Sequence, residues 1–161
     1  MLLVEVAKIS DLGLAIEGEE SGELLELAGD PYTREIGPIR YRLFAEKVSR
    51  EVVVRGTVET ELERACLRCG EFYSTTVMDS SFLRAYDVSA GVESIDVTPG
   101  LREAILLYLP TFSRCKPDCM GLCHQCGRNL NLGPCSCAPP PEKGRLDGLG
   151  GLCLEEDQDA D

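Results

Sequence analysis

Histidine is nearly absent from this sequence: His124 is the single example among 161 residues. A serine or cysteine nucleophile that relies on a histidine base has only this one candidate partner. The sequence also lacks a glycine-rich loop of the kind that cradles phosphates, and it contains no recognisable catalytic pair of carboxylates. We therefore expect a noncatalytic protein, with no catalytic residue, no organic cofactor site and no small-molecule substrate.

Long apolar runs are missing as well. No stretch approaches the roughly 18 to 20 consecutive apolar residues that cross a bilayer, which excludes a membrane span. At the start of the chain, Glu5, Lys8 and Asp11 interrupt the apolar region that a secretory signal requires. These features predict a cytoplasmic protein that does not associate with membranes.

Positive charge is scarce, because 28 acidic residues face 16 basic ones and the net charge is −12. This excess disfavours long-range attraction to nucleic acid and suits a basic protein partner. Basic side chains beside the cysteines could form a local patch that binds nucleic acid, or they could neutralise the negative charge of the thiolates. Both interpretations remain open. The candidate members of the patch are Arg64, Arg68, Arg114, Lys116 and Arg128.

Cysteine, in contrast, is abundant, with nine residues in the chain. Cytosolic thiols are kept reduced, so metal binding explains this number better than disulfides do. Two close cysteine pairs can hold one tetrahedral Zn²⁺ ion with zinc–sulfur bonds of about 2.3 Å. Only Cys153 has no near neighbour. The sequence predicts two structural zinc sites built from the four close pairs Cys66/Cys69, Cys115/Cys119, Cys123/Cys126 and Cys135/Cys137.

Other uses of these cysteines fit less well. A redox motif would be expected beside a βαβ unit, whereas the residues around the first pair have a strand pattern. The spacing matches neither common ferredoxin pattern, and buried apolar cysteines would not cluster in this way. The glycines after the two CxxC motifs, Gly70 and Gly127, are expected to adopt positive φ in a metal-binding turn. We expect His124 to lie beside a ligand without being one.

The pairing of the four cysteine pairs is not fixed by spacing, since they can be divided between two ions in three ways. The favoured division places Cys123, Cys126, Cys135 and Cys137 in one local site. The pair Cys66/Cys69 then joins Cys115/Cys119 in a long-range clamp. The main alternative combines the two CxxCG motifs, as in a zinc ribbon, and leaves Cys115/Cys119 with Cys135/Cys137.

Hydrophobic patterning predicts an α+β fold with a mainly antiparallel β body, one short amphipathic helix and a cysteine-rich zinc-binding C-terminal segment. Alternation favours strands over 2–9, 39–47, 51–65 and 72–83, the last two forming a hairpin with Cys66 and Cys69 at its tip. A helix is expected to start with Thr98 as N-cap and Pro99 at the first helical position, and to end before Pro110. Its apolar stripe, expected to be core, is Leu101, Ala104, Ile105, Tyr108 and Leu109.

Composition divides the chain into three parts. Residues 1–112 form the β-rich body with hairpin and helix, and residues 113–138 form the zinc-binding segment. Residues 139–161 are rich in proline, glycine and acid, which predicts a disordered tail, or an acidic arm that contacts a basic partner. Cys153 is expected to be unligated there.

The order CLRCG, then LPTF, then CKPDCMGLCHQCGRNLNLGPCSC resembles the YceD-like family of bacterial and plastid proteins over roughly residues 1–138. His124 replaces the usual proline of that family. The resemblance implies a role in ribosome biogenesis, supporting accumulation of large-subunit (23S) ribosomal RNA, and supplies no catalytic residue.

The expected partner is a basic ribosomal protein of the large subunit, rRNA, or both. One mechanistic hypothesis is that the zinc-bound segment and hairpin tip offer an acidic surface to the ribosomal protein. The alternative function is a zinc-dependent thiol redox switch or a nuclease-associated enzyme.

Overall fold

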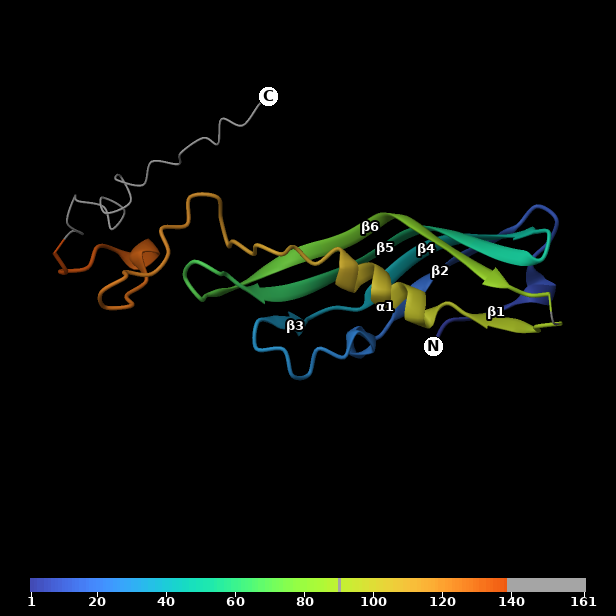
Figure 1. Cartoon of the computed structure of the whole chain (residues 1–161), viewed down its shortest axis with the longest axis horizontal. Helices are drawn as coiled ribbons and strands as arrows, with labels where there is room; N and C mark the ends of the chain where they lie inside the picture. Colours follow the sequence, from blue (N-terminus) through green and yellow to red (C-terminus); the bar gives the residue numbers. More distant parts are fainter. Residues whose placement is uncertain (90, 139–161) are drawn as a thin grey trace, which may run out of the picture.

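A five-stranded antiparallel sheet forms the body of the molecule in the computed structural model, which describes residues 1–89 and 91–138. Its central strand, β5, pairs with β4 and β3 along one edge and with β6 along the other, and β2 lies outside β4 (Figure 1). The strands are β2 (Leu14–Glu20), β3 (Thr33–Glu35), β4 (Ile39–Val48), β5 (Glu51–Ala65) and β6 (Phe72–Asp87). The expected antiparallel β body is confirmed.

The three long strands follow the predicted pattern closely. β5 has the predicted bounds, β4 extends one residue beyond the prediction, and β6 continues to Asp87 because its last residues pair with the start of β5. Strands β2 and β3 were not predicted. β3 has only three residues, and β2 contains Gly18 and a run of acids, so neither has the β-branched composition that marks a strand in sequence.

The predicted strand over 2–9 is too long. Only β1 (Leu3–Glu5) is extended, and it pairs with β7 (Ser94–Asp96) in a separate two-stranded sheet. The ladder ends where the Val6 N–H donates to the Glu93 carbonyl, 2.8 Å away. From there the chain enters a 3-10 helix, η1 (Val6–Lys8), because no further partner strand is present beside it among the described residues.

Helix α1 (Thr98–Leu107) lies across one face of the sheet, against β5 and β6 (Figure 1). The predicted N-cap is wrong. Val97 occupies the cap position, and the hydroxyl of Thr98 instead accepts a hydrogen bond from the Leu2 N–H at 2.8 Å. This bond ties the start of α1 to the N-terminal segment. Among the residues that the structure describes, no helix is sufficiently long and apolar to cross a membrane.

The predicted apolar stripe of the helix is confirmed in its first two turns. Leu101, Ala104 and Ile105 are fully buried. Tyr108 is a correction to that prediction: it lies past the last helical residue and is half exposed, and its hydroxyl is 2.9 Å from the Ser81 hydroxyl. The helix ends before Tyr108, and this side chain contacts β6 through its hydroxyl without joining the hydrophobic core.

The hydrophobic core lies between α1 and the sheet and does not include any of the described cysteines. It contains Leu62 and Phe82 from β5 and β6 together with Leu101 and Ile105 from α1. Three of the cysteines, Cys66, Cys69 and Cys119, belong to a second, separate buried cluster at the far end of the hairpin. The body and the cysteine-rich end are therefore packed as two units joined along the hairpin.

Strand β5 contains a β-bulge between Gly56 and Val58, where its register with β6 shifts. Gly56 has φ of 154°, and a Cβ atom there would lie 2.1 Å from the Arg42 carbonyl oxygen of β4. Such a contact is far below any van der Waals distance. Only glycine fits between the two strands at this point.

Candidate metal centres

The structure gathers the eight paired cysteines into two groups of four. Cluster 1 consists of Cys66, Cys69, Cys115 and Cys119, and cluster 2 of Cys123, Cys126, Cys135 and Cys137. Within each cluster all four sulfur atoms lie within 4.8 Å of one another. This is the division that the sequence favoured over the zinc-ribbon pairing of the two CxxCG motifs.

The two CxxCG motifs form the same turn. In the first, the Gly70 N–H donates to the Cys66 carbonyl and the Cys66 N–H donates to the Glu71 carbonyl, each at 2.8 Å. In the second, Gly127 and Cys123 make the equivalent bonds, also at 2.8 Å. Both glycines have positive φ, 76° and 71°, as expected. Each turn brings its two cysteine sulfurs to one side of the backbone.

Cluster 1 joins two distant parts of the chain. Cys66 and Cys69 sit in the turn between β5 and β6, and Cys115 and Cys119 follow α1. Two hydrogen bonds hold the segment after α1 against the hairpin. The Arg64 side chain donates to the Pro110 carbonyl at 2.6 Å, and the Leu67 N–H donates to the Ser113 carbonyl at 2.9 Å. The clamp that the sequence suggested thus has hydrogen bonds that position both of its halves.

The sulfur separations fit a tetrahedral metal ion. A tetrahedron with metal–sulfur bonds of about 2.3 Å has sulfur–sulfur edges of about 3.8 Å. In cluster 1 the Cys66–Cys119 and Cys69–Cys115 sulfurs are both 3.8 Å apart, and in cluster 2 the Cys123–Cys135 sulfurs are 3.4 Å apart. Disulfide sulfurs lie about 2.05 Å apart, so these pairs are free thiols. Each cluster can hold one metal ion.

The acidity of the thiols also indicates a cation site. Burial raises the pKa of the Cys66 thiol, but backbone N–H donors at Cys115, Arg68 and Cys69 outweigh burial and lower the pKa to about 6. Burial, then the neighbouring sulfurs, raise the pKa of Cys115 to about 12. Burial also raises the pKa of Cys119, but the Asn131 side chain and the Gly121 N–H outweigh burial and lower the pKa overall. Burial raises the pKa of Cys69. Two thiolates are therefore stabilised without metal, and negative charge on the other two needs a cation.

Cluster 2 likewise contains one thiol with a lowered pKa and one with a raised pKa. Backbone N–H groups of Cys126 and Gln125 lower the pKa of Cys123 to about 6. Hydrogen bonding with Cys126, followed by burial, raises the pKa of Cys137 to about 12. This cluster is more open, because Cys126 is exposed whereas three of the four cluster 1 residues are buried.

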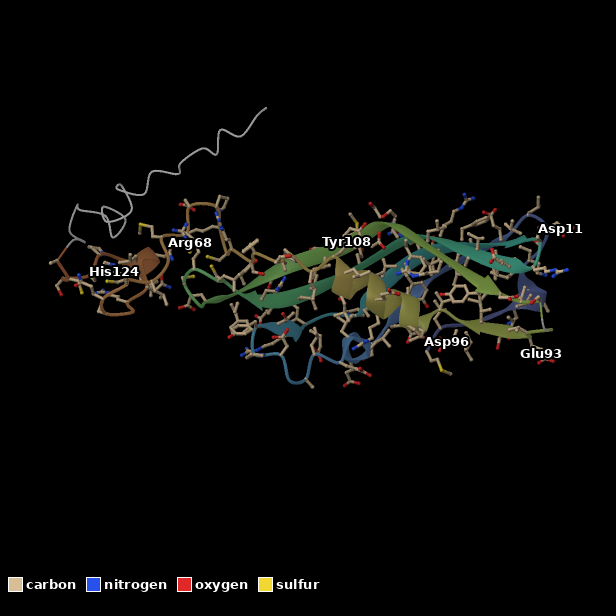
Figure 2. The ribbon with its side chains drawn as sticks, viewed as in Figure 1. Asp11, Arg68, Glu93, Asp96, Tyr108 and His124 are labelled. Atoms are coloured by element: carbon tan, nitrogen blue, oxygen red, sulfur yellow. The ribbon has the colours of Figure 1, made fainter. Side chains whose placement is uncertain are left out.

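His124 follows the first ligand position of cluster 2 but does not join it. Its side chain is exposed, and no described group of candidate ligands contains it. Figure 2 shows His124 and Arg68 at the same end of the molecule. Cys153 lies outside the described residues.

One residue near the clusters plays a part that sequence reasoning missed. Asn129 caps the short turn that follows it, because its side chain accepts a hydrogen bond from the Asn131 N–H. The Asn131 side chain donates to the Cys119 sulfur of cluster 1 at 3.3 Å. No sequence signal marks this contact, because an asparagine twelve residues from a cysteine has no characteristic spacing.

Charged side chains are distributed unevenly between the cysteine-rich end of the molecule and the rest of the body. The cysteine tip, defined as residues 64–71 and 110–138, has five basic residues and two acidic ones, Glu71 and Asp118. The rest of the body, residues 1–63 and 72–109, has nine basic and nineteen acidic residues. Asp11 and Glu93 lie at the end opposite Arg68 and His124 (Figure 2).

Comparison with known proteins finds a family whose model matches the part of the chain that contains α1 and most of the clustered cysteines. The family described as large ribosomal RNA subunit accumulation protein YceD matches residues 84–153. Residues 84–153 are a YceD-family region. The match covers α1, the second half of cluster 1 and all of cluster 2, and it confirms the resemblance to the YceD-like family.

One of the individual relatives carries the same family name. A chloroplastic YCED homolog 1 of Zea mays, named as a large ribosomal RNA subunit accumulation protein, is 39% identical over 51 residues, which are 31% of this chain and 17% of that protein. An uncharacterized protein of Mycobacterium leprae is 31% identical over 111 residues, 60% of this chain and 51% of the relative.

An uncharacterized protein of Mycobacterium tuberculosis is 31% identical over 137 residues, 76% of this chain and 59% of the relative. The chain thus spans between half and three fifths of the length of these mycobacterial relatives. No solved structure matches the chain.

Proposed function

We propose that this protein is a noncatalytic zinc-binding factor in ribosome biogenesis that supports the accumulation of large-subunit (23S) ribosomal RNA. The observation that carries the proposal is the YceD-family match over the region that holds α1 and cluster 2. The family and the chloroplastic relative of Zea mays are both named as large ribosomal RNA subunit accumulation proteins. The protein acts in the cytoplasm, where reduced thiols remain free to bind metal.

Zinc is the metal we propose, and all eight clustered cysteines are its ligands. Four thiolates around one ion form the closed, tetrahedral environment of structural zinc sites, with no position left for water or substrate. This donor set supports a structural role for the metal and gives no support to metal-assisted catalysis. Residues 113–138 form the zinc-binding segment, and residues 1–112 form the β body that presents it. The proposed tail, residues 139–161, lies outside the described residues.

The charge distribution changes the expected mode of partner binding. The tip has few acidic side chains, but two zinc ions with four thiolates each would add a charge of −2 per centre, which brings the formal charge of the metal-bound tip to about −1. The tip as a whole is then close to neutral, and its positive charge is local, at individual arginines. Arg68 and Arg128 are exposed, and neither forms an ion pair with another described residue. We propose that the tip contacts rRNA phosphates, while the acidic body faces a basic ribosomal protein of the large subunit.

Crosslinking in cells, followed by sequencing of bound RNA, tests the RNA contact. The double variant Arg68→Gln/Arg128→Gln is compared with Arg42→Gln/Arg50→Gln, which removes two exposed arginines from the body. We expect the tip variant to lose large-subunit rRNA and the body variant to retain it. With purified protein, the slope of log affinity against log salt concentration should become shallower by about one for each arginine–phosphate pair that the tip variant removes.

Depletion of the protein tests its role in assembly. Profiles of ribosomal subunits should then show a loss of large subunits relative to small ones. Normal large-subunit levels would refute the assembly role. Equal loss of RNA in the tip and body variants would refute the proposed contact while leaving that role intact.

A further inference from the structure

Asn131 connects the two clusters although it is a ligand of neither. Its Nδ2 group donates to the Cys119 sulfur of cluster 1 at 3.3 Å, and its Oδ1 accepts from the Met120 N–H at 2.9 Å. Both contacts are to the CKPDC half of cluster 1 and the residue that follows it. Asn131 itself comes from the loop between the two ligand pairs of cluster 2.

That loop holds the Asn131 side chain in one place. The loop forms a short 3-10 helix, η3 (Leu130–Leu132), capped by Asn129. The Asn129 Oδ1 accepts from both the backbone N–H and the Nδ2 of Asn131, at 3.0 and 2.8 Å. The Leu130 N–H also donates to the Gly121 carbonyl at 2.9 Å. A metal ion bound by cluster 2 would hold the loop at both ends, at Cys126 and at Cys135.

A donated N–H affects a metal–thiolate bond in two ways. It stabilises negative charge on the sulfur, and it fixes the direction in which the sulfur points toward the metal. Such outer contacts commonly contribute about 10- to 100-fold to metal affinity. Cys119 is 1% exposed, so water does not readily replace a missing donor there.

We propose that the two clusters bind metal cooperatively and that Asn131 is the positioning residue that couples them. This inference rests on the proposed metal binding. An ion in cluster 2 orders η3, η3 places Nδ2 against the Cys119 sulfur, and cluster 1 then binds its own ion more tightly. By linkage, an ion in cluster 1 strengthens cluster 2 by the same factor, which for such couplings is about 5- to 150-fold.

Titration of the full chain with Co²⁺ tests the coupling, because thiolate-to-cobalt absorption reports binding directly. The variant Cys135→Ser/Cys137→Ser removes half of the cluster 2 ligands. We expect the affinity of cluster 1 in this variant to fall about tenfold below its affinity in the wild-type chain. An unchanged affinity would overturn the proposal.

Asn131→Asp separates the hydrogen bond to sulfur from the general structure of the loop. Aspartate keeps the acceptor for the Met120 N–H but replaces the donor to Cys119 with a negatively charged oxygen. We expect cluster 1 affinity to fall by about tenfold or more, as in Asn131→Ala. With ¹¹³Cd as the probe, the resonance of cluster 1 should shift while that of cluster 2 stays in place.

Gln125→Ala is the matched control. Gln125 is also an amide in cluster 2, but its Nε2 donates to the Ala138 carbonyl, 3.1 Å away, and does not contact cluster 1. This variant should leave cluster 1 affinity unchanged. In the Cys135→Ser/Cys137→Ser background, Asn131→Asp should have little further effect. Full effect in that background, or equal weakening by Gln125→Ala, would overturn the proposal.

The failures of the two proposals are distinguishable. A wild-type chain that binds no Co²⁺ or Zn²⁺ would contradict both. A chain that binds two ions with independent constants would contradict only the coupling, and the proposed zinc-binding function would stand.

Discussion

Thr98 illustrates how one side chain can join two elements in place of its expected local role. Its hydroxyl is buried and accepts the Leu2 N–H, which has no other partner among the described hydrogen bonds. The interaction is therefore a link between the N-terminal segment and α1, not a helix cap.

Replacing this hydroxyl gives the first prediction. Thr98→Val keeps the shape of the side chain but leaves the Leu2 N–H buried without an acceptor. We expect the free energy of unfolding to fall by about 1–3 kcal/mol, measured by urea denaturation. Thr98→Ser retains the oxygen and should lose less. A larger loss in Thr98→Ser than in Thr98→Val would contradict this prediction, because it would show that packing of the methyl group matters more than the hydrogen bond.

At the scale of elements, the bulge in β5 determines how closely β4 can approach. The absence of a side chain at Gly56 lets the Arg42 carbonyl and Leu43 lie directly against its backbone. This close approach sits in the middle of the longest part of the ladder, where β4, β5 and β6 are all paired.

Gly56→Ala is accordingly expected to destabilise the sheet by about 3 kcal/mol, since the new Cβ would meet backbone atoms of β4, which cannot rotate away as a flexible side chain can. The midpoint of chemical denaturation measures this effect. Gly29→Ala is the control, because a Cβ at Gly29 meets nothing within 4 Å and should change stability by less than about 0.5 kcal/mol. A similar loss in both variants would contradict the close approach at Gly56.

The elements differ in how well the sequence predicted them, for physical reasons. β5 and the cysteine pairs have strong local patterns, because alternation and ligand spacing are imposed within a few residues. β3 and β7 have three residues each and exist only because a partner strand lies beside them. The hydrogen bond from Asn131 to Cys119 likewise depends on tertiary structure alone. Features that depend on a few neighbouring residues could be predicted from the sequence, whereas contacts between distant segments could not.

At the scale of the whole molecule, the separate packing of body and cysteine tip leads to a prediction about metal removal. The core between α1 and the sheet contains none of the clustered cysteines. The elongated arrangement in Figure 1 places cluster 2 beyond the end of the hairpin. Loss of metal should therefore disorganise the tip without unfolding the body.

We expect a strong zinc chelator to shift the amide NMR signals of residues 113–138 into the narrow range typical of unfolded chain, while those of β4 and of residues 51–63 of β5 keep their positions. Added Zn²⁺ should restore the original positions of the shifted signals, which serves as the control for reversibility. If the signals of β4 and of residues 51–63 shifted together with those of the tip, the two parts would form one cooperative unit, contrary to this expectation.

The spacing of the ligands along the chain sets the order in which the two centres can assemble. The contacting sulfurs of cluster 2 are 12 residues apart in sequence, whereas those of cluster 1 are 46 and 53 apart. Closing the longer loop costs about 1.3 kcal/mol more chain entropy, and it also requires that the β5–β6 hairpin and α1 already exist. Cluster 2 can thus form early from a short stretch of chain. Cluster 1 forms last, because its two ligand pairs come together only after the body has folded.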